Sequence, residues 1–356
     1  MKKIVLTGGG TAGHVTPNIA LIPALLEKGY EISYIGSYDG MERKLIEDYK
    51  IPYYGIATGK FRRYFDPKNF TDPFRVIKGI GEARKILKEI DPDIVFSKGG
   101  FVAVPVVRGA YRLHIPVISH ESDMTPGLAN KICLPMAKVI CCNFPETLKN
   151  LPKGKAVLTG TPIRAELMRG SREKGFAFTG FSGEKPVIMV TGGSLGAMAV
   201  NTAIREALPE LLVRYDVVHL CGKGKLDESL VGRPGYVQYE YIKEEMADLF
   251  AMADLVISRA GANAICEIAS LRKPNLLIPL SAKASRGDQI LNARSFENQG
   301  FSVVIEEESL TTMTLLQAVD DLYEKRQTYI DAMSKSDQSD AVSVIVKLIE
   351  ENRRGA

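Results

Sequence analysis

The residues best suited to chemistry lie in one stretch, SRAGANAICEIASLRKPNLLIPLSAKASRGDQILNA, from Ser258 to Ala293. The apolar run Ala253–Ile257 predicts a buried strand, residues 258–262 predict a turn of small residues, and Asn263–Arg272 has the apolar spacing of a helix. The free N–H groups of such a helix start and the positive end of its dipole favour a phosphate group. This stretch therefore predicts a site that holds a diphosphate without a metal ion.

Polar side chains in the same stretch suit a sugar. Glu267 lies in the second turn of the predicted helix, and its carboxylate can reach back to the helix start because helical side chains lean toward the N-terminus. After a predicted strand at Pro274–Leu280, the polar loop Ser281–Gly287 leads into a second helix that begins with Asp288 and Gln289. Both side chains can bond vicinal hydroxyls, so the stretch predicts a nucleotide-sugar site. Taken singly, Glu267 is equally an acid favoured by the helix dipole, and Asp288 an N-cap.

A second candidate site opens the chain. Lys3–Leu6 predicts a short strand, Gly8–Gly13 (GGGTAG) a phosphate-type turn, and the following residues a helix through Leu26. His14 opens that helical stretch, where the dipole disfavours its charged form, and a neutral imidazole can accept a proton. His14 is therefore the candidate base. The alternative is a histidine that only caps or packs the helix start.

The glycines of this first turn also fit another class of protein. Gly8, Gly10 and Gly13 match the dinucleotide pattern G-x-G-x-x-G. The second strand, however, ends at Ile35, Gly36 and Ser37, with no acid placed to hold an adenosine ribose. A dehydrogenase is thus a minor alternative.

The chain contains two similar halves. PVIMVTGGSLGA aligns with KKIVLTGGGTAG, so Thr191 falls on Thr7 and a glycine turn recurs. Apolar runs alternate with helical stretches in both halves, which predicts two Rossmann-like, doubly wound parallel sheets facing a cleft. The predicted hinge is Gly160–Arg164, which gives domains at residues 1–163 and 164–340. We expect the substrates in the cleft between them. The apolar runs include Ile32–Ile35, Ile94–Phe96, Val117–Ile118, Val217–Leu220 and Leu276–Ile278.

Composition narrows the class of protein. The chain has 356 residues, of which 45% are hydrophobic and 25% charged, enough for two globular cores. The N-terminus lacks the pattern of an export signal, and no apolar run reaches transmembrane length. The net charge of +4 is too small to argue for a nucleic-acid partner. The five cysteines lie in apolar segments without zinc-like spacing, so we expect reduced core residues and no metal site.

Two further segments carry charge. Asp91 and Asp93 form a D-x-D pattern, but they precede the predicted strand Ile94–Phe96, whereas ligands gather at carboxyl ends; we expect turn residues. The segment Phe61–Ile80 mixes aromatic and aliphatic residues with basic residues that include Arg62, Arg63, Arg75 and Lys78, a composition suited to an anionic membrane surface. The alternative is that its apolar members are partly core and its bases a solvated face. Tyr111, with the neighbouring Arg108 and Arg112, would extend this surface.

Seven motifs together resemble the MurG family of N-acetylglucosaminyltransferases, and the resemblance covers nearly the whole chain. In this order and spacing they are far more specific than any single glycine turn. The motifs are GGGTAGH (Gly8–His14), SKGGFVAVP (Ser97–Pro105), HESD (His120–Asp123), TPIR (Thr161–Arg164), GGSLGA (Gly192–Ala197), SRAGANAICEI (Ser258–Ile268) and GDQILNA (Gly287–Ala293).

The resemblance implies a GT-B fold whose last helix, at about residues 341–356, packs back on the N-terminal domain. It implies an enzyme of peptidoglycan synthesis that needs no cofactor. Such an enzyme transfers N-acetylglucosamine from UDP to the C4 hydroxyl of lipid I, with inversion, and thereby forms lipid II. It also implies a peripheral protein on the cytoplasmic face of the cell membrane, with cell-wall synthesis and division proteins as candidate partners.

The family pattern implies a role for individual residues. The donor belongs in the C-terminal domain and the acceptor in the N-terminal domain, with His14 and Asp123 as the catalytic candidates near the acceptor hydroxyl. The donor residues are Ile242 for uracil, Glu267 for the ribose, Ser194, Arg164 and the helix start at Ala262 and Asn263 for the diphosphate side, and Gln289 with Asp288 for the sugar. Thr11, Ala12 and Gly13 close the site from the other domain.

Some positions depart from the common family pattern. Ala12 stands where a glycine is usual, so a methyl group narrows the approach of the acceptor diphosphate. Phe101 replaces a usual tyrosine, which removes a hydroxyl. Asp123 stands where an amide is common, and Asp288 replaces the first residue of a frequent glutamine pair. These departures affect the predicted acceptor contacts more than the predicted donor contacts.

Other functions fit the same fold. Within enzymes, the alternatives are a UDP-N-acetylglucosamine 2-epimerase and a glycolipid glycosyltransferase. Outside enzymes, the alternative is a non-catalytic module that binds sugar nucleotides. An epimerase acts on the donor with no acceptor, and a binding module does not turn the donor over.

Overall fold

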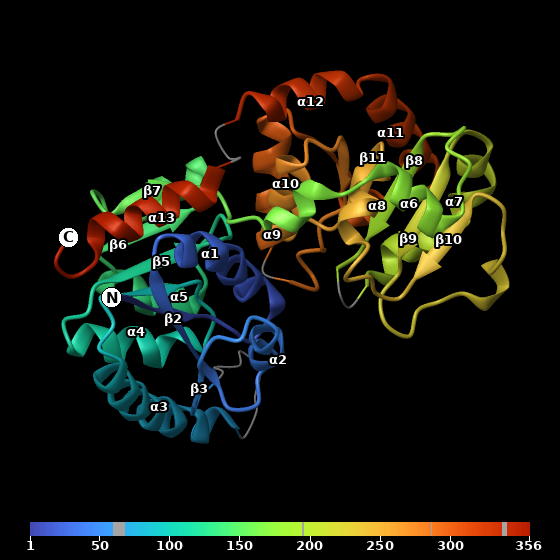
Figure 1. Ribbon diagram of the computed structural model, residues 1–356. Coiled ribbons are helices and arrows are strands. Elements are labelled where there is room, and N and C mark those ends of the chain that lie inside the picture. The colour runs from blue at the N-terminus through green and yellow to red at the C-terminus, as the bar shows by residue number, and fades with distance from the viewer. Residues whose placement is uncertain (60–67, 194–195, 286, 337–339) are drawn as a thin grey trace. The chain divides into compact units, whose positions relative to one another are not determined.

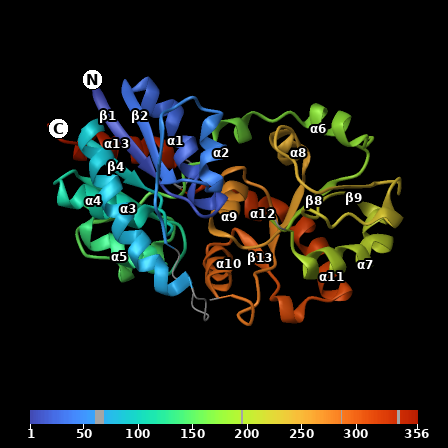
Figure 2. The same cartoon turned by 90° about the horizontal axis from the view of Figure 1, so that it is seen from below.

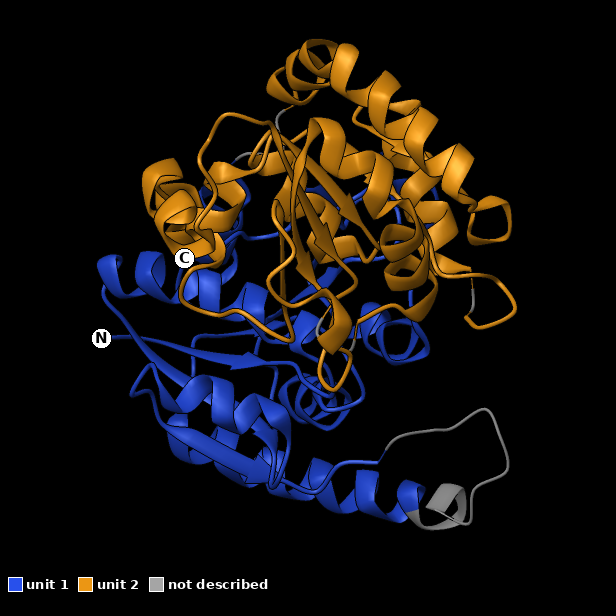
Figure 3. Ribbon diagram, turned by 90° about the vertical axis from the view of Figure 1, so that its right-hand side faces the viewer, with its two compact units in different colours: residues 1–164, 340–356 blue, residues 165–339 orange. Residues whose placement is uncertain are grey.

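The computed structural model describes residues 1–59, 68–193, 196–285, 287–336 and 340–356, with the backbone alone for 68–71. The chain forms two compact units, coloured separately in Figure 3. Unit 1 comprises Met1–Arg164 with Asp340–Ala356, and unit 2 comprises Ala165–Ser339. Each unit is built on one sheet in which all paired strands run parallel (Figure 1). The prediction of two doubly wound α/β halves is therefore confirmed.

The sheet of unit 1 has seven strands in the order β3-β2-β1-β4-β5-β6-β7. The strands are β1 (Lys2–Thr7), β2 (Tyr30–Ser37), β3 (Tyr53–Ile56), β4 (Ile94–Ser97), β5 (Val117–Glu121), β6 (Val139–Cys142) and β7 (Ala156–Leu158). The helices are α1 (Thr16–Glu27), α2 (Met41–Glu47), α3 (Lys68–Ile90), α4 (Ala103–Arg112), α5 (Leu128–Cys133) and α13 (Ala341–Asn352).

Both faces of this sheet are covered, which explains why its strands are apolar at successive positions. Ile4 and Leu6 pack into a core with α1 and α13, while the intervening Val5 packs on the other side with α3 and α4. Figure 2 shows α3, α4 and α5 together on one side of the sheet. A parallel strand buried on both faces reads as a continuous apolar run rather than an alternating one.

The sheet of unit 2 has six strands in the order β10-β9-β8-β11-β12-β13. The strands are β8 (Val187–Thr191), β9 (Asp216–Leu220), β10 (Tyr236–Tyr239), β11 (Leu255–Ser258), β12 (Asn275–Leu277) and β13 (Ser302–Val304). The helices are α6 (Arg172–Thr179), α7 (Met198–Arg214), α8 (Met246–Met252), α9 (Ala262–Ser270), α10 (Asp288–Asn298), α11 (Thr312–Glu324) and α12 (Arg326–Ser334). Apolar residues of α7 and α11 share one core with β8, β9 and β11.

The elements around the candidate donor stretch fall close to where the sequence predicts them. The strand expected at Ala253–Ile257 is β11, two residues later, and the helix expected at Asn263–Arg272 is α9. The strand expected at Pro274–Leu280 is shorter, since β12 ends at Leu277. All five cysteines are buried free thiols, as expected.

Helix α13 returns to unit 1 after the chain has built unit 2. Ile345, Val346 and Ile349 are buried in the core that α1 and the first sheet share. At its far end, the Glu350 carboxylate accepts hydrogen bonds from Lys2 Nζ and from the Tyr30 hydroxyl. Apolar burial thus docks the helix, and Glu350 links its last turn to the amino ends of β1 and β2.

This docking makes a prediction about stability. Replacing the fully buried Ile345 by Ala leaves a cavity, so unfolding of unit 1 should become easier by about 2–5 kcal/mol, measured by denaturant titration. The neighbouring Val344 is 37% exposed, and Val344→Ala is the matched control, with an expected change within about 1 kcal/mol. Equal stability of the two variants would show that α13 is not part of this core.

Candidate active site

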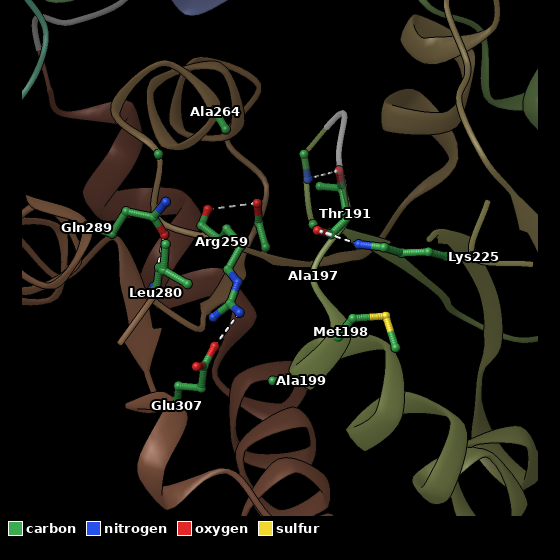
Figure 4. A pocket seen from close by; sticks show the side chains of 15 residues that line it. Thr191, Ala197, Met198, Ala199, Lys225, Arg259, Ala264, Leu280, Gln289 and Glu307 are labelled. Carbon is green, nitrogen blue, oxygen red and sulfur yellow. Dashed lines mark hydrogen bonds and ion pairs between the residues drawn. The ribbon is translucent and has the colours of Figure 1, made fainter. Parts of the chain in front are cut away.

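A pocket of about 640 Å³ lies in unit 2 at the carboxyl ends of β8 and β11 (Figure 4). The register of the two strands places Thr191 beside Ser258, so the turns that follow both strands meet at the same edge of the sheet. Met198 of α7, Ala264 of α9 and Gln289 of α10 all line the pocket. Three helices therefore begin around one cavity.

The turn after β8 depends on glycine. Gly196 has a φ of +67°, and a Cβ atom added there would lie 2.0 Å from the carbonyl oxygen of Cys221. No other residue fits that position without moving the neighbouring backbone. Lys225 Nζ donates to the Gly196 carbonyl at 3.2 Å, which holds the turn and brings a cation to the pocket. Ser194, predicted on the diphosphate side, lies outside the described residues.

The starts of α7 and α9 are suited to an anion. Ala197 and Gly261 occupy their N-cap positions, and neither start carries a side-chain cap or an acidic first turn among the residues that the structure describes. The first N–H groups of a helix have no intrahelical acceptor, and the dipole adds positive potential. Small residues at both starts let a phosphate approach these N–H groups.

Arg259 is a pocket residue that the sequence interpretation did not single out, although it directly follows β11. Its guanidinium donates to the carbonyls of Ile278 at 3.1 Å and Pro279 at 3.2 Å, and forms an ion pair with Glu307. These bonds fix the guanidinium at the pocket wall (Figure 4). Lys225 was also missed, because no helix start or strand end marks its place in the sequence.

Gln289 lines the pocket, and its orientation is defined. Its amide oxygen accepts from the backbone N–H of Leu280 at 3.0 Å, so the amide nitrogen is the group that it can offer to a ligand. Asp288 is the first residue of α10 and Gly287, with a φ of +79°, is the N-cap. The alternative interpretation of Asp288 as an N-cap is therefore wrong, because the left-handed backbone at that position favours glycine.

Four more of the predicted donor residues, Ala262, Asn263, Glu267 and Ile242, lie in unit 2 but outside the pocket lining. Ala262 is buried in the first turn of α9, and Asn263 follows it half-buried. Glu267 is half-buried one turn after the pocket residue Ala264, on the same side of α9. Ile242 is buried between β10 and α8.

In unit 1, the buried carboxylate of Glu42 holds the loop after β1 through a hydrogen bond. Glu42 is fully buried; its Oε2 accepts from the Gly10 N–H at 3.3 Å, and its Oε1 accepts from the Ser37 N–H at 2.9 Å and from the Ser37 hydroxyl. Gly10 has a φ of +86°, and a Cβ atom there would lie 2.4 Å from the Phe101 ring. Glu42 was missed because it lies in α2, thirty-two residues from the loop it binds.

His14 does not begin a long helix, contrary to the prediction. Thr11, Ala12, Gly13 and His14 form a 3₁₀ turn with Thr11 as its N-cap, and α1 begins at Thr16. Pro17 explains this start, since a residue without an N–H group fits the first turn of a helix. His14 Nδ1 lies 2.8 Å from the Thr11 hydroxyl. With Nδ1 as the donor in this bond, Nε2 carries the lone pair that can take a proton.

The His14 imidazole is neutral at ordinary pH. Burial disfavours its charged form, the nearby Lys98 ammonium adds repulsion, and together they lower the pKa of His14 to about 4. Burial and the Lys98 charge, rather than the helix dipole, thus favour the neutral imidazole.

Lys98 is almost completely buried, and it is hydrogen-bonded to the loop that carries Asp123. Its Nζ donates to His120 Nδ1 at 3.0 Å and to the Ser122 hydroxyl, and His120 Nε2 donates to the Gly160 carbonyl at 2.8 Å. Glu121 Oε1 accepts from the Asp123 N–H at 3.0 Å. Burial raises the pKa of Glu121 to about 7. These bonds hold the half-buried Asp123 on a defined loop after β5.

Two further predictions concern the D-x-D pair, Asp91 and Asp93, and the predicted diphosphate residue Arg164. Asp91 and Asp93 are turn residues at the amino end of β4, as expected: Asp93 accepts from the Lys3 N–H at 2.7 Å, and Asp91 pairs with Arg354 at 3.0 Å. Within the described ranges, no group of three or more His, Cys, Asp or Glu side chains could hold a metal ion. Arg164 ends unit 1, and its Nε is buried without a hydrogen bond to any described residue.

Comparison with known proteins extends these observations. The glycosyltransferase family 28 N-terminal domain matches residues 4–141, and the family's C-terminal domain matches residues 187–349. A relative from Lachnoclostridium phytofermentans is 65% identical over 353 residues, which cover 99% of both chains. It is named UDP-N-acetylglucosamine--N-acetylmuramyl-(pentapeptide) pyrophosphoryl-undecaprenol N-acetylglucosamine transferase.

Solved structures show the same fold. The crystal structure of Acinetobacter baumannii MurG has a TM-score of 0.77 and 28% identity, covering 99% of this chain and 100% of that one. A UDP-GlcNAc 2-epimerase from Neisseria meningitidis, bound to UDP-GlcNAc, has a TM-score of 0.69 at 13% identity, covering 99% of this chain and 100% of that one. The epimerase likeness concerns the fold alone.

Two Rossmann-like units, one with an anion pocket between helix starts, define a glycosyltransferase of the GT-B class. The family resemblance of the sequence implied this fold, and the two similar halves agree with it. The chain belongs to glycosyltransferase family 28 and, within it, to the MurG family of N-acetylglucosamine transferases.

Proposed function

We propose that this enzyme transfers N-acetylglucosamine from UDP to the C4 hydroxyl of undecaprenyl-diphospho-N-acetylmuramoyl-pentapeptide, lipid I, and so forms lipid II for peptidoglycan synthesis. The observation that carries the proposal is the unit 2 pocket, where two uncapped helix starts and two cations surround one cavity. A relative named for this reaction and 65% identical over nearly the whole chain supports the choice of substrates.

In this proposal the donor binds in unit 2. The N–H groups at the starts of α7 and α9, with Lys225 and Arg259, hold the diphosphate, and Arg164 adds its unpartnered guanidinium N–H. Glu267 bonds the ribose hydroxyls, and Ile242 lies at the uracil. Gln289 donates its amide N–H to the sugar, with Asp288 beside it.

The chemical step follows from these roles. The acceptor oxygen attacks the anomeric carbon in line, the bond from that carbon to the diphosphate oxygen breaks, and UDP leaves with the bonding electron pair. His14 Nε2 takes the proton of the acceptor hydroxyl while Thr11 holds Nδ1. The helix starts and the cations stabilise the charge that develops on the leaving diphosphate. Asp123 is the second candidate for the proton, on the loop that Glu121 holds.

One experiment separates the proposed reaction from its alternatives. UDP-N-acetylglucosamine is incubated with and without a short-chain lipid I acceptor, and UDP release is measured together with the identity of the sugar products. Release that requires the acceptor supports the transferase. Conversion of the donor without acceptor would indicate a 2-epimerase, and tight donor binding without turnover would indicate a non-catalytic module.

The ribose assignment predicts a shared loss of affinity. Glu267→Ala should weaken UDP and UDP-N-acetylglucosamine alike, by up to about 3 kcal/mol, because both ligands contain the ribose. Gln289→Ala is the matched control, since it should weaken the sugar nucleotide and spare UDP. Isothermal titration calorimetry measures both ligands. Parental UDP affinity in Glu267→Ala would show that another residue holds the ribose.

The base assignment predicts a loss confined to turnover. His14→Ala should lower kcat by about 100-fold or more, while UDP affinity stays parental because none of the proposed donor contacts involves His14. Thr11→Val keeps the His14 ring but removes the hydroxyl that bonds its Nδ1, and should lower kcat by a smaller factor. If His14→Ala turns over like the parent at saturating substrates, the role passes to Asp123.

The pKa of His14 predicts the pH profile of the parent. A base is active only when unprotonated, so kcat/KM should stay level as pH falls through 6.5 and decline near pH 4. Donor and acceptor are supplied at concentrations well below KM, so that the measured kcat/KM reports the pKa of the base in the free enzyme. A decline centred at pH 6.5 would mean that the base has an ordinary histidine pKa and is not the buried His14.

A part of unit 1 suits a membrane surface. Phe74 is 74% exposed and Ile77 is 66% exposed on α3, next to the exposed Arg75 and Lys78. Residues 61–67 of the predicted surface and the Phe70 side chain lie outside the described residues. The described part thus favours an exposed apolar patch with basic neighbours over core packing. No helix within the described ranges has the length and hydropathy needed to cross a bilayer.

Tyr111 lies apart from this patch. α3 and α4 run in the same direction, since Gly79 packs on Pro105 and Gly109 packs on Arg84. Tyr111, exposed with Arg108 and Arg112, is therefore roughly 13 Å further along the helices than Ile77. We propose that Phe74 and Ile77 insert at a peripheral, cytoplasm-facing membrane contact and that Tyr111 is a separate feature.

Liposome binding tests this contact. Phe74→Ser with Ile77→Ser should lower co-sedimentation with anionic liposomes at least about tenfold, because two apolar side chains lose their burial in lipid. Turnover of a short-chain soluble acceptor should remain. Val213→Ser with Met313→Ser is the control, since these residues are as exposed but belong to unit 2. Equal binding of both double variants would refute the assignment.

A further inference from the structure

A second pocket lies in unit 1, at the carboxyl ends of β2 and β3. It has a volume of about 280 Å³, and its lining includes Ser37 at the end of β2, Asp39 after β2, Thr58 after β3, Asp72 and Arg75 of α3, and Phe101 after β4. Ligands of open α/β sheets bind outside the carboxyl ends of the strands. Neither the donor nor the proposed base accounts for this pocket.

The pocket shares a wall with the loop that precedes His14. The Phe101 ring lies against Gly10, and the same ring lines the pocket. Glu42 joins the two sites, because its carboxylate bonds both Gly10 of the loop and Ser37 of the pocket wall. A molecule whose reacting atom lies at this loop can therefore place a neighbouring part of itself in the pocket.

The lining carries charges of both signs. Asp72 is buried, while Asp39 and Arg75 are exposed at the pocket mouth. Two carboxylates repel a phosphate or an anionic lipid headgroup, and a neutral sugar would offer no anionic partner for the Arg75 charge. A peptide suits the lining, because its carboxylates can pair with Arg75 and its N–H or ammonium groups can donate to the two aspartates.

We propose that this pocket binds part of the peptide that the acceptor carries. The inference rests on the proposed function, in which the acceptor is a lipid-linked muramoyl-pentapeptide. A volume of about 280 Å³ is at the small end for a ligand pocket, so it takes a segment of the pentapeptide and leaves the remainder in solvent. Arg75 pairs with a peptide carboxylate, and Asp39 accepts from a peptide N–H or ammonium group.

Kinetics with two acceptors tests the subsite. A short-chain acceptor with the full pentapeptide is compared with the same molecule lacking the peptide. Arg75→Glu should raise KM for the pentapeptide acceptor about tenfold, and thereby abolish the preference of the parent for that acceptor. Asp39→Asn should raise the same KM by a smaller factor. Lys85→Glu makes the same change of charge on an exposed part of α3 and should retain the preference.

The outcomes decide the proposal separately from the function. A KM that rises equally for both acceptors, or that does not rise at all, would overturn the peptide assignment while transfer itself continues. If the parent transferred no sugar, the proposed function would fall, and binding of free muramoyl-pentapeptide, measured by calorimetry, would still test the pocket. Binding to the parent that Arg75→Glu weakens and Lys85→Glu retains supports it, whereas no binding to the parent refutes it.

Discussion

The proposed donor site depends on backbone N–H groups at two helix starts that no described side chain caps. A parallel sheet places the ends of neighbouring strands at one edge, and each strand is followed by a helix whose first N–H groups need acceptors. In unit 2 the pairing of Thr191 with Ser258 brings two such helix starts together. A bound diphosphate can satisfy several of these groups at once, so the fold itself supplies most of the anion site.

Close approach of backbone and ligand explains the glycines of both turns. Gly196 lies against the Cys221 carbonyl, and Gly10 lies against the Phe101 ring. A side chain at either position would displace the turn, and with it the helix start that follows. The constraint is steric: each of the two positions must lack a side chain so that the turn can keep its shape.

Buried charges organise unit 1 in a comparable way. Glu42 holds the first loop through Gly10, Lys98 holds the loop of Ser122 through its hydroxyl, and Glu121 holds Asp123 through its N–H. Each of these side chains is buried, so its hydrogen bonds are strong and its loss would leave polar groups unsatisfied. The same burial, with Lys98, keeps His14 neutral and fit to accept a proton.

The sequence by itself determined the two parallel sheets, the glycine turns and the helix starts at Ala262 and Asp288, because apolar periodicity and turn residues are local signals. Its motifs also identified the family. Only the tertiary structure decided that Arg259 and Lys225 line the proposed donor pocket and that Glu42 supports the loop after β1. These contacts join residues far apart in the chain, and no local pattern records which distant groups burial brings together.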